Sequence, residues 1–174
     1  MAKKILFVIA PENFRDEELF EPLQVMEIKG AKTTIASTKT GTARGKMGGT
    51  VEIGLNVKDC HSRDYDAIAF VGGNGVEQFK LYENSDVLRL AREFSNAGKP
   101  TCAICIAPRI LAAAGVIKGK KATCFPDPES IAMVKQSGAH YSTEHMVVDG
   151  NVITADGPKA AQDFGLKIAE ALKL

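Results

Sequence analysis

The stretch that decides the fold of this chain is Thr101-Cys102-Ala103-Ile104-Cys105-Ile106-Ala107-Pro108. Its apolar first half is typical of a buried strand, and Pro108 suits the first turn of a helix, where its missing N–H costs nothing. Ala103 and Ala107 are small, as a tight turn between a strand and a helix requires. Such a corner is how α/β enzymes present a nucleophile. The sequence therefore predicts Cys105 as a nucleophile at the end of a strand.

Outward from this corner, strands and helices alternate along the chain. Strands are predicted at 5–10, 33–37, 67–71 and 101–105, and a hairpin at 147–153 around an Asp-Gly turn. Helices are predicted at 16–30, 76–81, 86–97, 109–114, 126–135 and 159–172, with a loop at 11–15. Residues 38–54 indicate a β-excursion from the main sheet. The alternation predicts one α/β domain over residues 1–174, with a mainly parallel sheet covered on both faces.

Three polar or glycine-rich stretches follow three of the predicted strands, at residues 11–18, 72–75 and 105–108. In open parallel sheets, ligands bind at the carboxyl ends of the strands, near the point where the strand order reverses. We therefore expect these stretches to meet at one edge and form the site.

The bulk composition excludes several classes of protein. The net charge of +1 on 174 residues speaks against a nucleic-acid footprint. No apolar run reaches the length of a membrane span, and the amino terminus leads straight into a strand rather than a signal peptide. We therefore expect a cytoplasmic protein without nucleic-acid or membrane partners, whose four cysteines are thiols.

Cys105 would lie near the N–H groups of the helix that follows it, which predicts a lowered pKa for its thiol. With Cys102 it forms a Cys-x-x-Cys motif, which could indicate a redox pair or a zinc site. However, Cys102 lies within the strand, where side chains three apart point to opposite faces, and a second such motif is absent. We therefore predict Cys102 to be a core residue, Cys60 and Cys124 to be incidental, and no metal site.

Glu18 belongs to an acidic run, Asp16-Glu17-Glu18, at the start of a predicted helix. Acids in a first turn interact favourably with the helix dipole, and Asp16 and Glu17 need no further role. Alternatively, Glu18 points toward Cys105, and burial keeps it protonated so that it can donate to a thiolate or relay a proton. The residues alone leave both interpretations of Glu18 open.

Gly72-Gly73-Asn74-Gly75 lacks the spacing of a dinucleotide-binding loop. It predicts either a plain tight turn or a nest of N–H groups that holds an oxyanion formed at Cys105. The N–H of Ile106 would be the second donor. The three histidines, His61, His140 and His145, do not follow the core strand ends, and we expect them at the surface or in packing roles.

Several motifs along the chain resemble those of one family. They are Glu18-Leu19 with Pro22, Gly72-Gly73, Ala103-Ile104-Cys105, and Asp149-Gly150 through Gly157-Pro158 to Asp163-Phe164-Gly165-Leu166. The chain resembles the ThiJ/PfpI family of the class I glutamine-amidotransferase-like superfamily, which includes the human parkinsonism-associated deglycase and archaeal intracellular peptidases. The resemblance implies a flavodoxin-like α/β sandwich and a homodimer or higher homo-oligomer. It also implies Cys105 as nucleophile, Glu18 as its carboxyl partner, and Gly72 and Gly73 beside the cysteine.

The chain departs from that family at four positions. Arg15 stands where some members have a second acid, and Ile106 stands where the peptidases have a histidine. Ala107 stands where a glycine is common, and Phe125 stands where many deglycases have a histidine. The resemblance therefore implies glyoxalase or deglycase chemistry without a cofactor, on α-oxoaldehydes or glycated protein. A non-catalytic oxidative-stress sensor or chaperone acting through oxidation of Cys105 is the alternative. A cysteine peptidase or amidase would need a histidine brought to Cys105 by a subunit interface.

Overall fold

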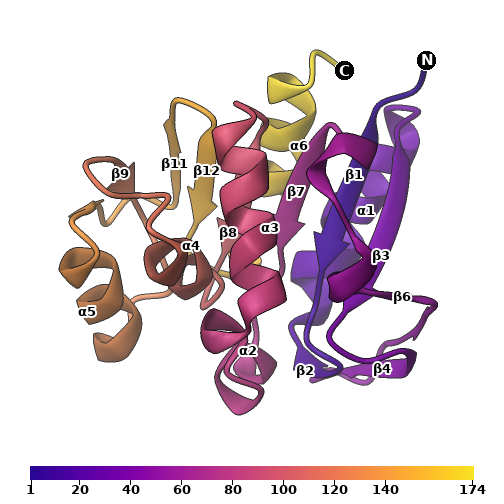
Figure 1. The fold of residues 1–174 in the computed structure, drawn as a ribbon, viewed down its shortest axis with the longest axis horizontal. Coiled ribbons are helices and arrows are strands. Elements are labelled where there is room, and N and C mark those ends of the chain that lie inside the picture. The colour runs from indigo at the N-terminus through magenta and orange to yellow at the C-terminus, as the bar shows by residue number, and fades with distance from the viewer.

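The computed structural model describes all 174 residues and is built on a seven-stranded sheet (Figure 1). Its strands, in spatial order, are β11 (Met146–Asp149), β12 (Val152–Ala155), β8 (Thr101–Ile104), β7 (Ala67–Phe70), β1 (Lys4–Val8), β3 (Lys32–Ser37) and β6 (Leu55–Asn56). All neighbouring pairs are parallel except β11 with β12, which form the predicted hairpin. The predicted flavodoxin-like sandwich is thus confirmed. The strand order reverses between β1 and β7.

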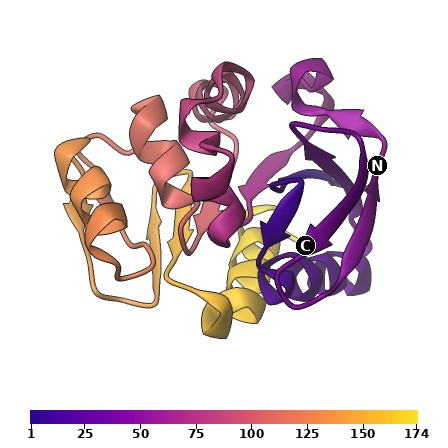
Figure 2. The same cartoon turned by 90° about the horizontal axis from the view of Figure 1, so that it is seen from below.

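Helices cover both faces of this sheet. They are α1 (Asp16–Ile28), α2 (Asn74–Gln78), α3 (Ser85–Asn96), α4 (Pro108–Ala114), α5 (Pro128–Gln136) and α6 (Ala161–Ala171). Figure 2 shows α1 and α6 side by side below the sheet, with α3 and α4 on the other side. Each face buries its own apolar cluster, one beneath α1 and α6 and one beneath α3 and α4. The longest helix has 13 residues, and none combines the length and apolar character that a bilayer crossing requires.

The predicted β-excursion is present as β4 (Gly41–Gly45) and β5 (Thr50–Ile53). The loop predicted at 11–15 contains a third strand, β2 (Glu12–Phe14), which pairs with β4. Asp16 ties this small sheet to α1, because its carboxylate accepts from the N–H groups of Met47 at 2.8 Å and Gly49 at 2.7 Å. The expectation that Asp16 serves only the helix dipole is therefore wrong. Its partners come from a turn about thirty residues away.

Short elements account for most other differences from the predicted pattern. A two-stranded sheet joins β9 (Lys121–Ala122) to β10 (His140–Tyr141). Single 3-10 turns occur at η1 (Val57–Asp59), η2 (Ser62–Asp64), η3 (Leu81–Glu83) and η4 (Pro158–Ala160). Elements of two or three residues carry no readable periodicity, because their pairing depends on distant partners.

Candidate active site

Cys105 stands at the corner between β8 and α4, as predicted. Its φ of +66° is left-handed, a conformation that costs a non-glycine residue about 1–3 kcal/mol. Two backbone hydrogen bonds hold it there: its N–H donates to the Ala155 carbonyl at 2.9 Å, and its carbonyl accepts from the N–H of Phe125 at 2.7 Å. The helix starts at Pro108 and ends at Gly115, whose φ of +78° makes it the left-handed cap. Strained corners of this kind present a nucleophile above the sheet edge.

Gly72 lies directly against the corner. A Cβ added there would lie 2.6 Å from the Cβ of Cys105 and 2.7 Å from Oε1 of Glu18, so no side chain fits. Gly73 adopts a φ of +107°, and the carbonyl of Gly72 accepts from the N–H of Arg15 at 3.0 Å. The three predicted stretches therefore do meet at one edge of the sheet, between the ends of β1, β7 and β8.

The N–H groups of Gly73 and Ile106 both interact with the Cys105 side chain, in the direction that favours a thiolate. These are the two donors expected from the sequence. The N–H of Gly72 acts instead on the carboxyl group of Glu18. Within the glycine pair, the N–H of Gly72 thus interacts with the Glu18 carboxyl group and the N–H of Gly73 with the Cys105 sulfur.

Glu18 is fully buried in the first turn of α1, and neither carboxyl oxygen has a regular hydrogen-bond partner in the structure. Burial raises the pKa of Glu18 to about 8, opposed by its interaction with the Cys105 thiol and by the positive charge of Arg15. A carboxyl group in this setting is largely protonated at neutral pH. Glu18 therefore has the properties of a proton donor beside Cys105, the second of the two alternatives that the sequence left open.

The pKa of the Cys105 thiol is raised, whereas the sequence predicted a lowered value. Burial raises the pKa of Cys105, and the charge of Glu18 raises it further, while the N–H groups of Gly73 and Ile106 lower it. The donors at the helix start are present, but the removal of the sulfur from water outweighs them. The thiol therefore depends on a proton acceptor or on its coupling to Glu18 for activation.

Cys102 lies in the core, as predicted, but not on the face opposite Cys105. Both belong to the apolar cluster beneath α1 and α6, because the chain leaves its extended conformation at Cys105 and the alternation of faces ends there. Burial raises the pKa of the Cys102 thiol, with no nearby donor to oppose it. Cys60 and Cys124 are buried free thiols in the cluster on the other face.

Arg109 is a buried charged residue that sequence reasoning did not single out. Its guanidinium donates to Glu77 at 2.6 Å, to Asp127 at 3.0 Å and to the hydroxyl of Ser130 at 2.7 Å. It thereby joins α4 to α2 and α5. Helix α2 follows the glycine pair, and α5 follows the Phe125 segment. The Arg109 network therefore holds α2, α4 and α5 in fixed positions around Cys105.

None of the three histidines hydrogen-bonds Cys105. His61 precedes the turn η2, and His140 is exposed in β10. His145 is also exposed, but its Nδ1 lies 2.6 Å from Oδ2 of Asp156, which directly follows β12. This pair was missed because Asp156 and His145 are eleven residues apart and meet only through the hairpin.

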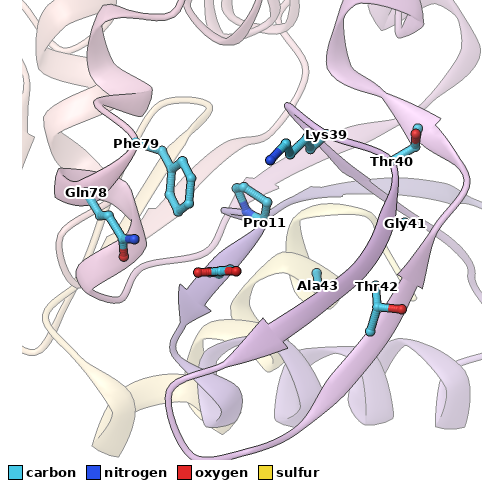
Figure 3. A pocket seen from close by; sticks show the side chains of 9 residues that line it. Pro11, Lys39, Thr40, Gly41, Thr42, Ala43, Gln78 and Phe79 are labelled. Atoms are coloured by element: carbon cyan, nitrogen blue, oxygen red, sulfur yellow. The ribbon is translucent and has the colours of Figure 1, made fainter.

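A hollow of about 450 Å³ lies away from Cys105, at the ends of β1, β3 and α2 and along β4. Figure 3 shows Lys39, Gln78 and Phe79 around Pro11. No group of three His, Cys, Asp or Glu side chains is arranged to hold a metal ion. At the corner itself, Cys105 is 5% exposed, and the backbone of Phe125 is hydrogen-bonded to it.

Comparison with known proteins agrees with this geometry. The sequence profile of the DJ-1/PfpI family matches residues 3–171. The chain belongs to the DJ-1/PfpI family. It is 45% identical to an uncharacterized protein of Methanocaldococcus jannaschii over 98% of this chain and 82% of that protein. It is 34% identical to Deglycase PH1704 of Pyrococcus horikoshii, over 89% of this chain and 90% of the relative.

A solved DJ-1/PfpI structure has the same fold over its whole length. The ThiJ/PfpI domain protein of Brachyspira murdochii superposes with a TM-score of 0.93 at 33% identity, covering 99% of this chain and 97% of that one. Further relatives that are named deglycases come from Pyrococcus furiosus, at 34% identity, and Thermococcus kodakarensis, at 31% identity.

Proposed function

We propose that this protein is a cofactor-independent, cysteine-dependent enzyme of glyoxalase or deglycase type, acting on α-oxoaldehydes or on their adducts with proteins. The observation that carries the proposal is the pairing of Cys105 with a buried, largely protonated Glu18 beneath the N–H groups of Gly73 and Ile106. Deglycase names among relatives at 34% identity support the same class of chemistry.

The reaction begins with attack of the Cys105 sulfur on the aldehyde carbon. A C–S bond forms, the thiol proton passes to the carbonyl oxygen, and the developing oxyanion accepts from Gly73 and Ile106. Glu18 then donates its proton to the neighbouring keto oxygen, while its other carboxyl oxygen takes the proton from the former aldehyde carbon, which gives an enediol. Glu18 returns that proton to the former keto carbon and takes the proton of the hydroxyl group on the sulfur-bearing carbon, which leaves a 2-hydroxy thioester and a protonated Glu18. Water cleaves the C–S bond and releases the hydroxy acid and the thiol. No external oxidant or reductant is needed, because one carbon is oxidised as its neighbour is reduced.

Lactate formation from methylglyoxal tests this function. Wild-type protein is incubated with methylglyoxal and lactate is followed by proton NMR, with Cys105→Ala and Glu18→Gln as the variants and Cys60→Ala as a matched control. We expect lactate from the wild type and from Cys60→Ala, and none above background from Cys105→Ala. Absence of lactate from the wild type, or an equal rate from Cys105→Ala, would exclude the reaction.

A second candidate is an oxidative-stress sensor or chaperone that acts through oxidation of Cys105. It is favoured by the exposure of the thiols: Cys105 is 5% exposed, whereas Cys60 is at 1% and Cys102 and Cys124 are at 0%. A small oxidant reaches only the first, and Glu18 can donate to the sulfinic acid formed there. Mild peroxide followed by peptide mapping checks this: uptake spread over all four cysteines counts against a sensor. Within one chain no histidine hydrogen-bonds Cys105, so a cysteine peptidase would need a histidine from a subunit interface.

A further inference from the structure

Two backbone hydrogen bonds join Cys105, the end of β12 and His145 in a row across this edge of the sheet. The N–H of Cys105 donates to the carbonyl of Ala155 at 2.9 Å, and the N–H of the next residue, Asp156, donates to the carbonyl of His145 at 3.1 Å. Neighbouring strands lie about 4.8 Å apart, so the backbone of His145 lies about 10 Å from that of Cys105. This interval is too long for the imidazole to touch the thiol. It is long enough for a small acyl group on the sulfur and one water molecule.

His145 and Asp156 form a pair with a defined chemistry. Oδ2 of Asp156 lies 2.6 Å from Nδ1 of His145, and the side chains are 20% and 88% exposed. A carboxylate on Nδ1 places the ring proton on that nitrogen and leaves the lone pair on Nε2. Nε2 is then an acceptor that faces water, held in orientation by Asp156 in the manner of a base and its positioning acid.

Glu18 cannot perform every proton transfer of the proposed reaction. It is fully buried, and both of its oxygens are enclosed without a partner, so bulk water does not reach it. Its position suits transfers on carbon and sulfur. The hydrolysis of a thioester needs instead a base that is in contact with solvent. Of the groups at this edge, the exposed His145–Asp156 pair meets that requirement.

We propose that Nε2 of His145 activates the water that hydrolyses the thioester on Cys105, with Asp156 as the positioning residue; this inference rests on the proposed function. The water oxygen bonds to the thioester carbon as Nε2 takes one of its protons. The C–S bond then breaks, and the released sulfur recovers the proton from the imidazolium through solvent. The products are the 2-hydroxy acid and the free thiol.

The experiment uses the full chain with methylglyoxal and compares His145→Ala with His140→Ala, which removes another exposed histidine from the same region. Lactate is followed by NMR, and thioester is trapped with hydroxylamine, which forms a hydroxamate from a thioester but not from a hemithioacetal. We expect His145→Ala to slow lactate release by about 100-fold, a common contribution of general base catalysis. Thioester should accumulate, and added imidazole should restore the rate. His140→Ala should behave as wild type.

Each other outcome overturns the inference in a recognisable way. A wild-type rate in His145→Ala excludes the base while leaving the proposed function intact. A slow variant without accumulated thioester and without rescue by imidazole shows that the pair only anchors β11. A wild type that makes no lactate removes the proposed function and this inference together.

Discussion

The Glu18 carboxyl and the Cys105 thiol share one enclosed space against Gly72, in which Glu18 is fully buried and Cys105 is 5% exposed. Burial raises the pKa of both groups, to about 8 for Glu18. The pair is therefore uncharged below that pH and carries one negative charge above it. That charge resides on Glu18, because burial and the charge of Glu18 raise the pKa of the Cys105 thiol more than the N–H groups of Gly73 and Ile106 lower it.

The raised pKa of Glu18 predicts a pH-dependent stability. Between about pH 4.5 and 8, the native state holds a proton that the unfolded chain has released, so the free energy of unfolding falls as pH rises. Glu18→Gln removes this dependence. We expect the stability of the wild type to fall by a few kcal/mol relative to the variant over this interval. Urea denaturation across the pH range measures it, with exposed Glu27→Gln as the control. A constant difference between wild type and Glu18→Gln at all pH values would contradict the assignment.

Gly72→Ala should damage the corner without changing any charge. Its Cβ would lie 2.6 Å from the carbonyl oxygen of Ile104 as well as from the Cβ of Cys105. Since backbone and a buried side chain must both move, we expect a loss of about 1–3 kcal/mol in stability and slower alkylation of Cys105 by iodoacetamide. Gly54→Ala is the matched control, because a Cβ there meets nothing within 4 Å. Equal melting temperatures for the two variants would count against the close contact.

Arg109→Met should be among the most destabilising single substitutions of a charged residue. The side chain of Arg109 is 5% exposed, and its removal leaves Asp127 and Glu77 without their buried cation. Breaking such a pair on one side costs about 3 kcal/mol. Lys167→Met, which removes an exposed pair with Glu170, should cost less than about 1 kcal/mol. Thermal denaturation of the two variants under one set of conditions provides the test. Comparable losses would show that Arg109 is not a structural hub.

Ile106→His should activate the thiol. An imidazolium beside Cys105 favours the thiolate, so the substitution should lower the pKa of the Cys105 thiol and speed its alkylation at neutral pH. Ile106→Gln controls for the loss of the apolar side chain while keeping its N–H donor. We expect at least a tenfold increase for histidine and little change for glutamine, measured by iodoacetamide labelling and mass spectrometry. A common rate for the two variants would show that burial controls the thiol regardless of its neighbour.

The amino-acid sequence alone determined the parallel α/β sheet, the corner at Cys105 and the convergence of its three loops. These follow from local rules: apolar runs between helices, small residues around a tight turn, and glycines that permit close approach. Glu18 was identified as a candidate from the acidic run, and the family resemblance pointed to its partner. Its buried position beside the sulfur is consistent with that expectation.

Only the tertiary structure decided the electrostatics of the site and its remote partners. The sequence placed Cys105 near helix donors and so predicted a lowered pKa, but desolvation depends on how completely α1, β7 and the glycine pair enclose the sulfur. The Arg109 network and the His145–Asp156 pair are likewise assembled from separate elements. Burial and long-range contacts arise from packing, and no local pattern of residues encodes them.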